Sequence, residues 1–87
     1  LRFTGWAARM VWERRWHPSQ ETRWVGKGEE ALEMILDLSS FEEIRRWILS
    51  WGPQVEVLSP TELRHEIIEA LTTTKKLYQG SSHAKLD

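Results

Sequence analysis

Two stretches of the chain alternate between apolar and polar residues. In residues 19–25, Trp24 falls on one face and Arg23 on the other. In residues 32–38 one face is apolar throughout, with Leu32, Met34, Leu36 and Leu38. Alternation with a period of two is typical of half-buried strands. Because residues 26–28 read Gly-Lys-Gly, a turn signal, the pattern predicts an antiparallel hairpin.

Apolar residues spaced three and four apart predict a helix on each side of this hairpin. The first covers about residues 6–16, is apolar on two sides and ends before Pro18. A helix with two apolar sides is expected to contact more than its own sheet. The second helix covers residues 41–51, because Ser40 and Glu43 have the spacing of a capping box and a Gly-Pro pair follows.

The two ends of the chain predict two further strands and a last helix. Residues 1–4 and 54–58 each fit a short strand. The last helix starts after Ser59, which is followed by a proline and, three residues on, by a glutamate. Its apolar face consists of Leu63, Ile67, Ala70 and Leu71. We expect this helix to fray at the three threonines of residues 72–74, since threonine is a poor helix former.

The order β-α-β-β-α-β predicts a ferredoxin-like sandwich, a mixed α/β (α+β) fold with an additional C-terminal helix. The domain is expected to span residues 1–78, and residues 79–87 are expected to form a disordered polar tail. In this fold the helices cover only one face of the sheet. The open face of so small a domain is expected to contact a partner, because buried apolar area is scarce at this size.

The composition fits a single small domain. Eighty-seven residues form one core, and the first residue, Leu1 instead of Met, indicates a piece of a longer protein. The absence of cysteine excludes disulfides and thiolate zinc sites. No apolar stretch is long enough to span a bilayer, and no signal peptide opens the chain. We therefore expect a soluble, cytoplasmic protein without membrane contact.

Positive charge and tryptophan are concentrated at the start of the chain. Residues 1–27 hold six basic and two acidic side chains, the remaining residues hold six and eleven, and four of the six tryptophans lie in the basic part. One interpretation is a surface for single-stranded nucleic acid, in which cations neutralise phosphates and indoles stack on bases. Its residues are Arg14, Arg15, Arg23 and Lys27 with Trp12, Trp16 and Trp24.

The alternative interpretation is that the tryptophans are core or dimer contacts, since burial is the commoner use of aromatic side chains. Trp6 and Trp12 are then the interface candidates, and the arginines are solvated or paired. Trp24 and Arg23 are neighbours in a strand and lie on opposite faces of the sheet. Only one of these two side chains is therefore expected on the open face.

Nothing in the sequence predicts catalysis, a metal or a cofactor. The three histidines are too scattered for a metal site. Four of the serines lie at helix ends, where capping explains them, namely Ser39, Ser40, Ser50 and Ser59. No nucleophile has a base at a recognisable spacing, so we expect no enzyme. Arg64 is unusual, because a cation in the first turn opposes the helix dipole. It is expected to have a fixed partner, which is either Glu56 or Glu62 of this domain or a group of an effector.

Four stretches in order carry a resemblance to a known family. The residues Arg2-Phe3, Ala8 and Val11 look like its opening strand and helix, and His17-Pro18-Ser19-Gln20 looks like its loop into the second strand. Residues 48–58, with the sequence ILSWGPQVEVL, and the P-x-x-L-R run that begins at Pro60 are similar to two later segments. Across residues 2–78 the chain resembles the C-terminal extension (WCX) domain of WYL-domain bacterial transcription regulators.

The resemblance implies a regulator with an N-terminal winged helix-turn-helix, a WYL domain and this extension, which works as a homodimer. In such proteins the WYL domain binds a ligand, in some members a nucleic acid, while the extension dimerises and transmits the signal. Neither the WYL tripeptide nor a helix-turn-helix occurs in these residues. Operator DNA would therefore be bound through a missing N-terminal domain, and the WYL domain of the same chain would be a partner.

Several residues are candidates for contact with an effector or partner. They are Arg14, Arg15, Trp16, His17, Arg23, Trp24 and Arg64. The effector is either a nucleic acid or a small molecule. A role in sensing small metabolites, in the manner of amino-acid-sensing ferredoxin-like domains, also stays open, because Gly5 and Gly52 lie at predicted strand–helix junctions.

Overall fold

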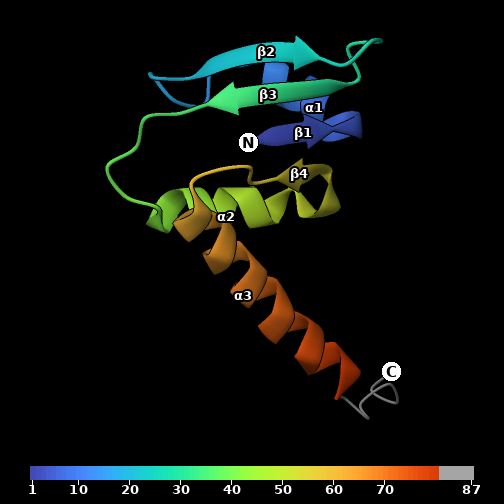
Figure 1. The fold of residues 1–87 in the computed structure, drawn as a ribbon, viewed down its shortest axis with the longest axis vertical. Coiled ribbons are helices and arrows are strands. Elements are labelled where there is room, and N and C mark those ends of the chain that lie inside the picture. The colour runs from blue at the N-terminus through green and yellow to red at the C-terminus, as the bar shows by residue number, and fades with distance from the viewer. Residues whose placement is uncertain (81–87) are drawn as a thin grey trace.

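The computed structural model of the chain describes residues 1–80 (Figure 1). Its elements are β1 (Arg2–Thr4), α1 (Gly5–Trp12), β2 (Glu21–Val25), β3 (Ala31–Ile35), α2 (Glu42–Ser50), the 3-10 turn η1 (Gly52–Gln54), β4 (Val55–Glu56) and α3 (Thr61–Gln79). This order confirms the predicted mixed α/β fold, β-α-β-β-α-β followed by one more helix.

The four strands form one antiparallel sheet in the order β2-β3-β1-β4, as in a ferredoxin-like sandwich. Phe3 lies opposite Leu32 on one side and Val55 on the other, and Leu32 in turn lies opposite Trp24. Because directly opposed residues share a face, these four side chains lie on the same face of the sheet. That face packs against α1 and α2, since Phe3 contacts Trp47 of α2.

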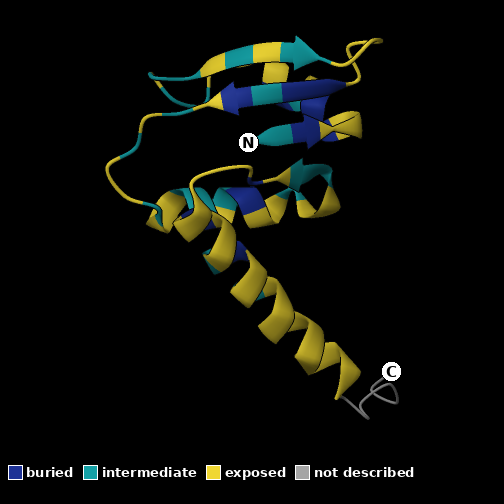
Figure 2. Cartoon of the chain, in the orientation of Figure 1, coloured by how far each residue is buried: buried dark blue, intermediate teal, exposed yellow. Residues whose placement is uncertain are grey.

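The core consists of two clusters that share partly buried neighbours (Figure 2). The first joins the sheet to α1 and contains Phe3, Ala7, Ala8, Val11, Leu32 and Met34. The second joins α2, β4 and the first turns of α3 and contains Ile48, Val57, Leu63 and Ile67. Trp47 and Val55 pack against both clusters and so connect them. Met34 is buried and Ile35 is exposed, which confirms the alternation predicted for this strand.

A glycine and a distant glutamine determine how α1 begins. Gly5 has a φ of +58°, which residues with a Cβ rarely adopt, and an added Cβ would lie 3.1 Å from Oε1 of Gln54. This same oxygen accepts a hydrogen bond from the backbone N–H of Ala7 at 2.7 Å. A side chain from η1 therefore satisfies one of the free N–H groups at the start of α1, where the N-cap residue makes no side-chain bond.

The first helix is shorter than the sequence predicts. It ends at Trp12 and not near Trp16. The backbone N–H of Trp16 donates to Oε1 of Gln20 at 2.6 Å, and Nε2 of Gln20 donates to the carbonyl of Arg14. These local bonds replace the i to i−4 bonds of a helix and turn the chain before Pro18.

The predicted caps of α2 and α3 are also wrong in position. The N-cap residues are Phe41 and Pro60, and neither makes a side-chain cap bond. Oγ of Ser40 accepts the backbone N–H of Glu42 at 3.3 Å, which is a local turn two residues long and not a capping box. The strands are shorter than predicted too, because the chain leaves the sheet after Ile35 and β4 has only two residues.

The last helix does not fray at its threonines but continues to Gln79. Within it, Oγ1 of Thr74 donates to the carbonyl of Ala70 at 2.8 Å, which satisfies the hydroxyl without disturbing the helix. Gln79, which was predicted to belong to the tail, is the last helical residue, and Gly80 is the C-cap. The remainder of the predicted tail, residues 81–87, lies outside the described residues.

Candidate functional site

Five aromatic side chains form one cluster between the sheet and the helices. Trp47 is central, with its ring centroid 5.6 Å from that of Phe3, 5.3 Å from Trp16 and 5.9 Å from Trp51. Trp6 extends the cluster to the surface, where it lies 5.9 Å from Trp51 and is 62% exposed. Such contacts contribute about 0.5–1.5 kcal/mol each beyond area burial. Most of this cluster therefore stabilises the fold.

Trp12 and Trp24 form a separate pair on the same side of the sheet. Their ring centroids are 5.8 Å apart in an edge-to-face arrangement, and Trp12 is 56% exposed. Arg23, the neighbour of Trp24 in β2, lies opposite Glu33 on the other face. The prediction that Trp24 and Arg23 lie on opposite faces is confirmed, and Arg23 is the one on the open face.

The basic residues of the N-terminal third are distributed over different parts of the surface. The guanidinium of Arg14 lies 4.9 Å from the ring centroid of Trp16, a cation–π contact. Arg15 donates to a backbone carbonyl in the loop that follows. Arg23 is on the open face of the sheet, and Lys27 lies in the turn between β2 and β3. The structure therefore does not bring these cations and the tryptophans onto one common surface.

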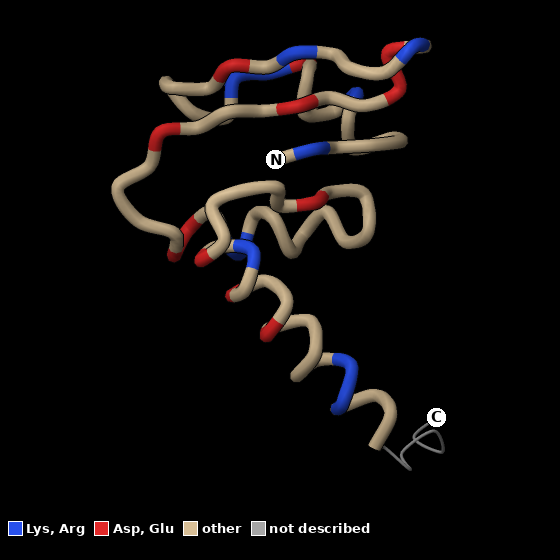
Figure 3. Tube along the Cα trace, viewed as in Figure 1, with Lys and Arg blue, Asp and Glu red and all other residues tan. Residues whose placement is uncertain are grey.

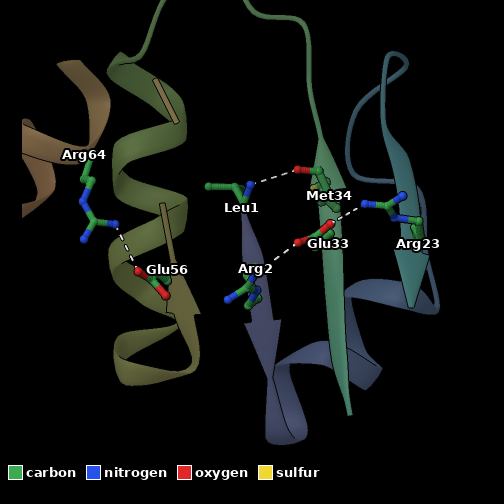
Figure 4. Close-up of polar contacts among 7 residues, drawn as sticks. All are labelled: Leu1, Arg2, Arg23, Glu33, Met34, Glu56 and Arg64. Atoms are coloured by element: carbon green, nitrogen blue, oxygen red, sulfur yellow. Dashed lines mark hydrogen bonds and ion pairs between the residues drawn. The ribbon is translucent and has the colours of Figure 1, made fainter. Parts of the chain in front are cut away.

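The open face carries a row of charges of alternating sign (Figures 3 and 4). Glu33 accepts from Arg23 at 2.8 Å and from Arg2 at 3.2 Å. The strand register places Arg2 opposite Glu56 as well, and Glu56 accepts from Arg64 at 3.0 Å. Each ion pair is partly exposed, so each contributes little to stability. The row instead makes this face polar and nearly neutral.

Arg64 pairs with Glu56, the first of the two intradomain partners that the sequence offered. It also donates to the carbonyl of Val57 at 2.8 Å. These bonds account for a cation in the first turn of α3.

Two groups of the sheet have a shifted pKa. The pKa of Glu33 is lowered, first by the hydrogen bond from Arg23 and then by that from Arg2. The pKa of the Leu1 amine is lowered mainly by burial.

The loop between α1 and β2 is held by its own side chains. In addition to the bonds of Gln20, Nδ1 of His17 accepts the backbone N–H of Ser19 at 3.0 Å. Oγ of Ser19 accepts the backbone N–H of Asp37 at 2.9 Å, which ties this loop to the segment that leaves β3. His17 thus makes its hydrogen bonds within this loop.

Two hollows lie on either side of residues 36–41, the segment between β3 and α2. One has a volume of about 380 Å³ and lies between the end of β3 and the starts of α2 and α3. The other, of about 450 Å³, is lined by residues that include Trp16, His17 and Trp47. Leu36, Leu38 and Ile44 line both. We name the second one the Trp16–Trp47 hollow.

Helix α3 projects beyond the rest of the domain (Figures 1 and 2). Its 19 residues give a length of about 28 Å, and its two buried residues, Leu63 and Ile67, lie in the first half. Apolar residues continue on the same side, and with Thr74 they form a continuous stripe. This α3 stripe consists of Leu63, Ile67, Ala70, Leu71, Thr74, Leu77 and Tyr78. Leu71 is 53% exposed, Leu77 is 70% exposed and Tyr78 is 80% exposed.

The projecting half of α3 and the Trp16–Trp47 hollow are not predicted from the sequence. For α3 a signal was present, because Leu71, Leu77 and Tyr78 continue the spacing of three and four that starts at Leu63. For the hollow there was none, since its walls come from loops and from residues far apart in the chain. Within residues 1–80, no three His, Asp or Glu side chains are grouped so as to hold a metal ion. In the same region no helix is long and apolar enough to cross a membrane.

Comparison with known proteins places this chain in a family. The family model of the WCX domain matches residues 1–74, which include all four strands and most of α3. No curated protein and no solved structure matches the chain. The WCX domain is the family that the sequence resemblance indicated. The chain belongs to the WCX domain family.

Proposed function

We propose that this domain is the dimerisation and ligand-response module of a cytoplasmic WYL-type transcription regulator, and that two copies pair through the projecting half of α3. The observation that carries the proposal is the exposed α3 stripe. At 100° per residue its members fall within about 120° of the helix circumference, the width of an apolar face that packs on a partner. No charged residue lies within the stripe.

A second copy of the chain is the occupant that suits this stripe. Two identical stripes related by a two-fold axis present the same apolar side chains to each other, as in most homodimers. The projecting half also contains Thr72, Thr73 and Thr74, which are poor helix formers. A helical end of this composition is marginal alone in water, so packing against a partner helix would stabilise it.

In this proposal the domain has no catalytic role. An effector that binds the WYL domain of the same chain favours one relative placement of the two paired extensions. That placement sets the distance between the two N-terminal winged helix-turn-helix domains and hence their fit to operator DNA. The effector therefore acts by shifting the population between two arrangements of the dimer.

The test is the solution mass of the 87-residue chain, measured by light scattering over a concentration series. We expect a dimer that dissociates in the micromolar range. Leu71→Glu places a charge in the stripe and is expected to weaken association by at least about tenfold, or 1.4 kcal/mol. Thr72→Glu is the matched control, since Thr72 lies about 100° around the helix from Leu71. It is expected to leave the mass unchanged.

Two outcomes would contradict pairing through α3. One is a strict monomer at every concentration, which would leave the α3 stripe for the WYL domain of the same chain. The other is a dimer that Leu71→Glu and Thr72→Glu affect equally, which would place the interface elsewhere. Circular dichroism of both variants checks that a changed mass does not reflect loss of the fold.

A further inference from the structure

Side-chain contacts hold the two indoles of the Trp16–Trp47 hollow in place. The two indoles that line it contact each other, with centroids 5.3 Å apart, and Trp47 is fixed by the aromatic cluster beneath. The indole N–H of Trp16 donates to the carbonyl of Val11 at 3.1 Å. Because that donor is already used inside the domain, Trp16 offers the hollow its aromatic ring and not a hydrogen bond.

The rim of the hollow is held in place by the bonds of two loops. Ser19 connects His17, which lines the hollow, to Asp37 at the end of β3. The backbone N–H of Ser19 donates to Nδ1 of His17, which orients the imidazole ring at the rim. The hollow is therefore formed in the free domain, as most small-molecule sites are. Its volume of about 450 Å³ lies within the usual range for such sites.

The charges that line the hollow are negative. Glu42 and Glu43, at the start of α2, lie on its wall beside the hydroxyls of Ser39 and Ser40. Among its lining residues in the described part of the chain there is no Lys or Arg. The start of a helix carries a partial positive charge of about half a unit, which two carboxylates outweigh. The carboxylates that line the hollow therefore favour a cation over a phosphate or a carboxylate, although the guanidinium of Arg14 lies against the Trp16 ring.

We propose that the Trp16–Trp47 hollow binds a small organic cation, an ammonium group attached to a flat or branched apolar body. The carboxylates attract the ammonium, and the aromatic and aliphatic walls cover the body. Indole rings attract cations through their faces, and the Trp16 ring already does so with the guanidinium of Arg14. This site extends the ligand-response part of the proposed function, but it does not depend on pairing through α3.

The test uses three probes of the same size and different charge: 2-phenylethylammonium, 2-phenylethanol and phenylacetate. Each is titrated into the 87-residue chain while the six indole N–H signals are followed by nuclear magnetic resonance. Conservative Trp→Phe variants assign the signals of Trp16 and Trp47. We expect these two signals to shift most. The ammonium should bind at least about fivefold more tightly than the alcohol, and the carboxylate most weakly.

Carboxamide variants test the role of charge without removing a core side chain. The double variant Glu42→Gln/Glu43→Gln should bring the ammonium close to the affinity of the alcohol and leave the alcohol unchanged. The double variant Glu62→Gln/Glu69→Gln, which removes the same charge from exposed positions of α3, should keep the preference. Equal binding of the three probes would overturn the proposal. Tighter binding of phenylacetate, or shifts that spare both Trp16 and Trp47, would also overturn it.

The same titration on the Leu71→Glu variant separates this site from dimerisation. The lining residues of the hollow lie between positions 16 and 47, far from the projecting half of α3 in the sequence. Equal affinity in the wild type and the variant is therefore expected. A failure of pairing through α3 would change the light scattering and leave the titration as it is. A failure of the cation site would do the reverse.

Discussion

At the scale of single residues, Glu33 links the stability of the domain to pH. It accepts hydrogen bonds from Arg23 and Arg2, and these lower its pKa in the folded state (Figure 4). The folded state therefore binds fewer protons than the unfolded chain does near the ordinary glutamate pKa of about 4.3. Stability from this source is present above that pH and is lost as the pH falls through the lowered pKa.

The first prediction follows from the direction of this pH dependence. The free energy of unfolding is expected to fall as the pH is lowered from about 5 towards the lowered pKa, and to fall less steeply in Glu33→Gln. Urea unfolding, followed by tryptophan fluorescence at several pH values, measures this slope. Glu69→Gln, at an exposed position of α3, is the control and should keep the wild-type slope. Equal slopes in all three proteins would mean that the ion pairs of Glu33 do not persist in solution.

At the scale of elements, α3 is divided into an anchored half and a projecting half. Leu63 and Ile67 are buried in the second core cluster, and Arg45 of α2 reaches Glu66 at 2.7 Å. Beyond Ala70 the helix contains no buried residue. The same apolar spacing therefore has two consequences along one helix. In the first half it holds the domain together, and in the second half it leaves a surface.

The second prediction compares the two halves by a leucine-to-alanine substitution in each. In the Leu71→Glu background, in which association is expected to be weakened, Leu63→Ala should lower the free energy of unfolding by about 3 kcal/mol. Leu77→Ala should change it by less than about 0.5 kcal/mol. If Leu63→Ala does not fold, Ile67→Val is the milder test, with an expected loss of about 1 kcal/mol. A comparable loss in Leu77→Ala would mean that the projecting half packs on the domain in solution.

The elements also show what a sequence can predict. The alternation around Leu32 and Met34 was sufficient to place β3, because one face of the strand is buried and burial is what the pattern reports. The end of α1 was not predictable in this way. It depends on Gln20, whose side chain takes the N–H of Trp16 through geometry that no periodicity encodes. Likewise, the threonines of α3 have low helix propensity, but the helix continues through them.

The candidate site was predictable only in part for the same reason. Trp16 and His17 were identified as contact residues from the composition and the family resemblance. Trp47, which completes the hollow, lies in an amphipathic helix where an aromatic residue usually belongs to the core. Bringing Trp47 beside Trp16 requires the fold, since the two residues belong to a loop and a helix that the sequence does not place together. Contacts of this range are decided by the packing of whole elements.

At the scale of the whole molecule, the basic N-terminal third does not become a basic face. Folding places Arg2 and Arg23 on either side of Glu33, and acidic and basic residues alternate across neighbouring strands (Figure 3). Of the aromatic residues in this third, Trp16 and Trp24 are partly covered by their neighbours. The net charge of the chain is −1. The uneven distribution of charge along the sequence is thus largely cancelled by ion pairs in the folded domain.

The third prediction concerns the rival interpretation, direct binding of single-stranded nucleic acid by this fragment. A continuous groove of cations with stacked aromatics is what such binding needs, and here Arg23 and Trp24 face opposite ways. Fluorescence anisotropy with a labelled oligothymidine should therefore show no saturable binding below about 100 µM at physiological salt. A dissociation constant below about 10 µM that rises steeply with salt would favour direct binding of nucleic acid. In that case Trp12→Ala would locate the surface. Trp12 is 56% exposed, and it lies next to the loop that contains Arg14 and Arg15. If Trp12→Ala leaves a weak binding unchanged, the contact is general electrostatic attraction, and the proposal of dimerisation stands.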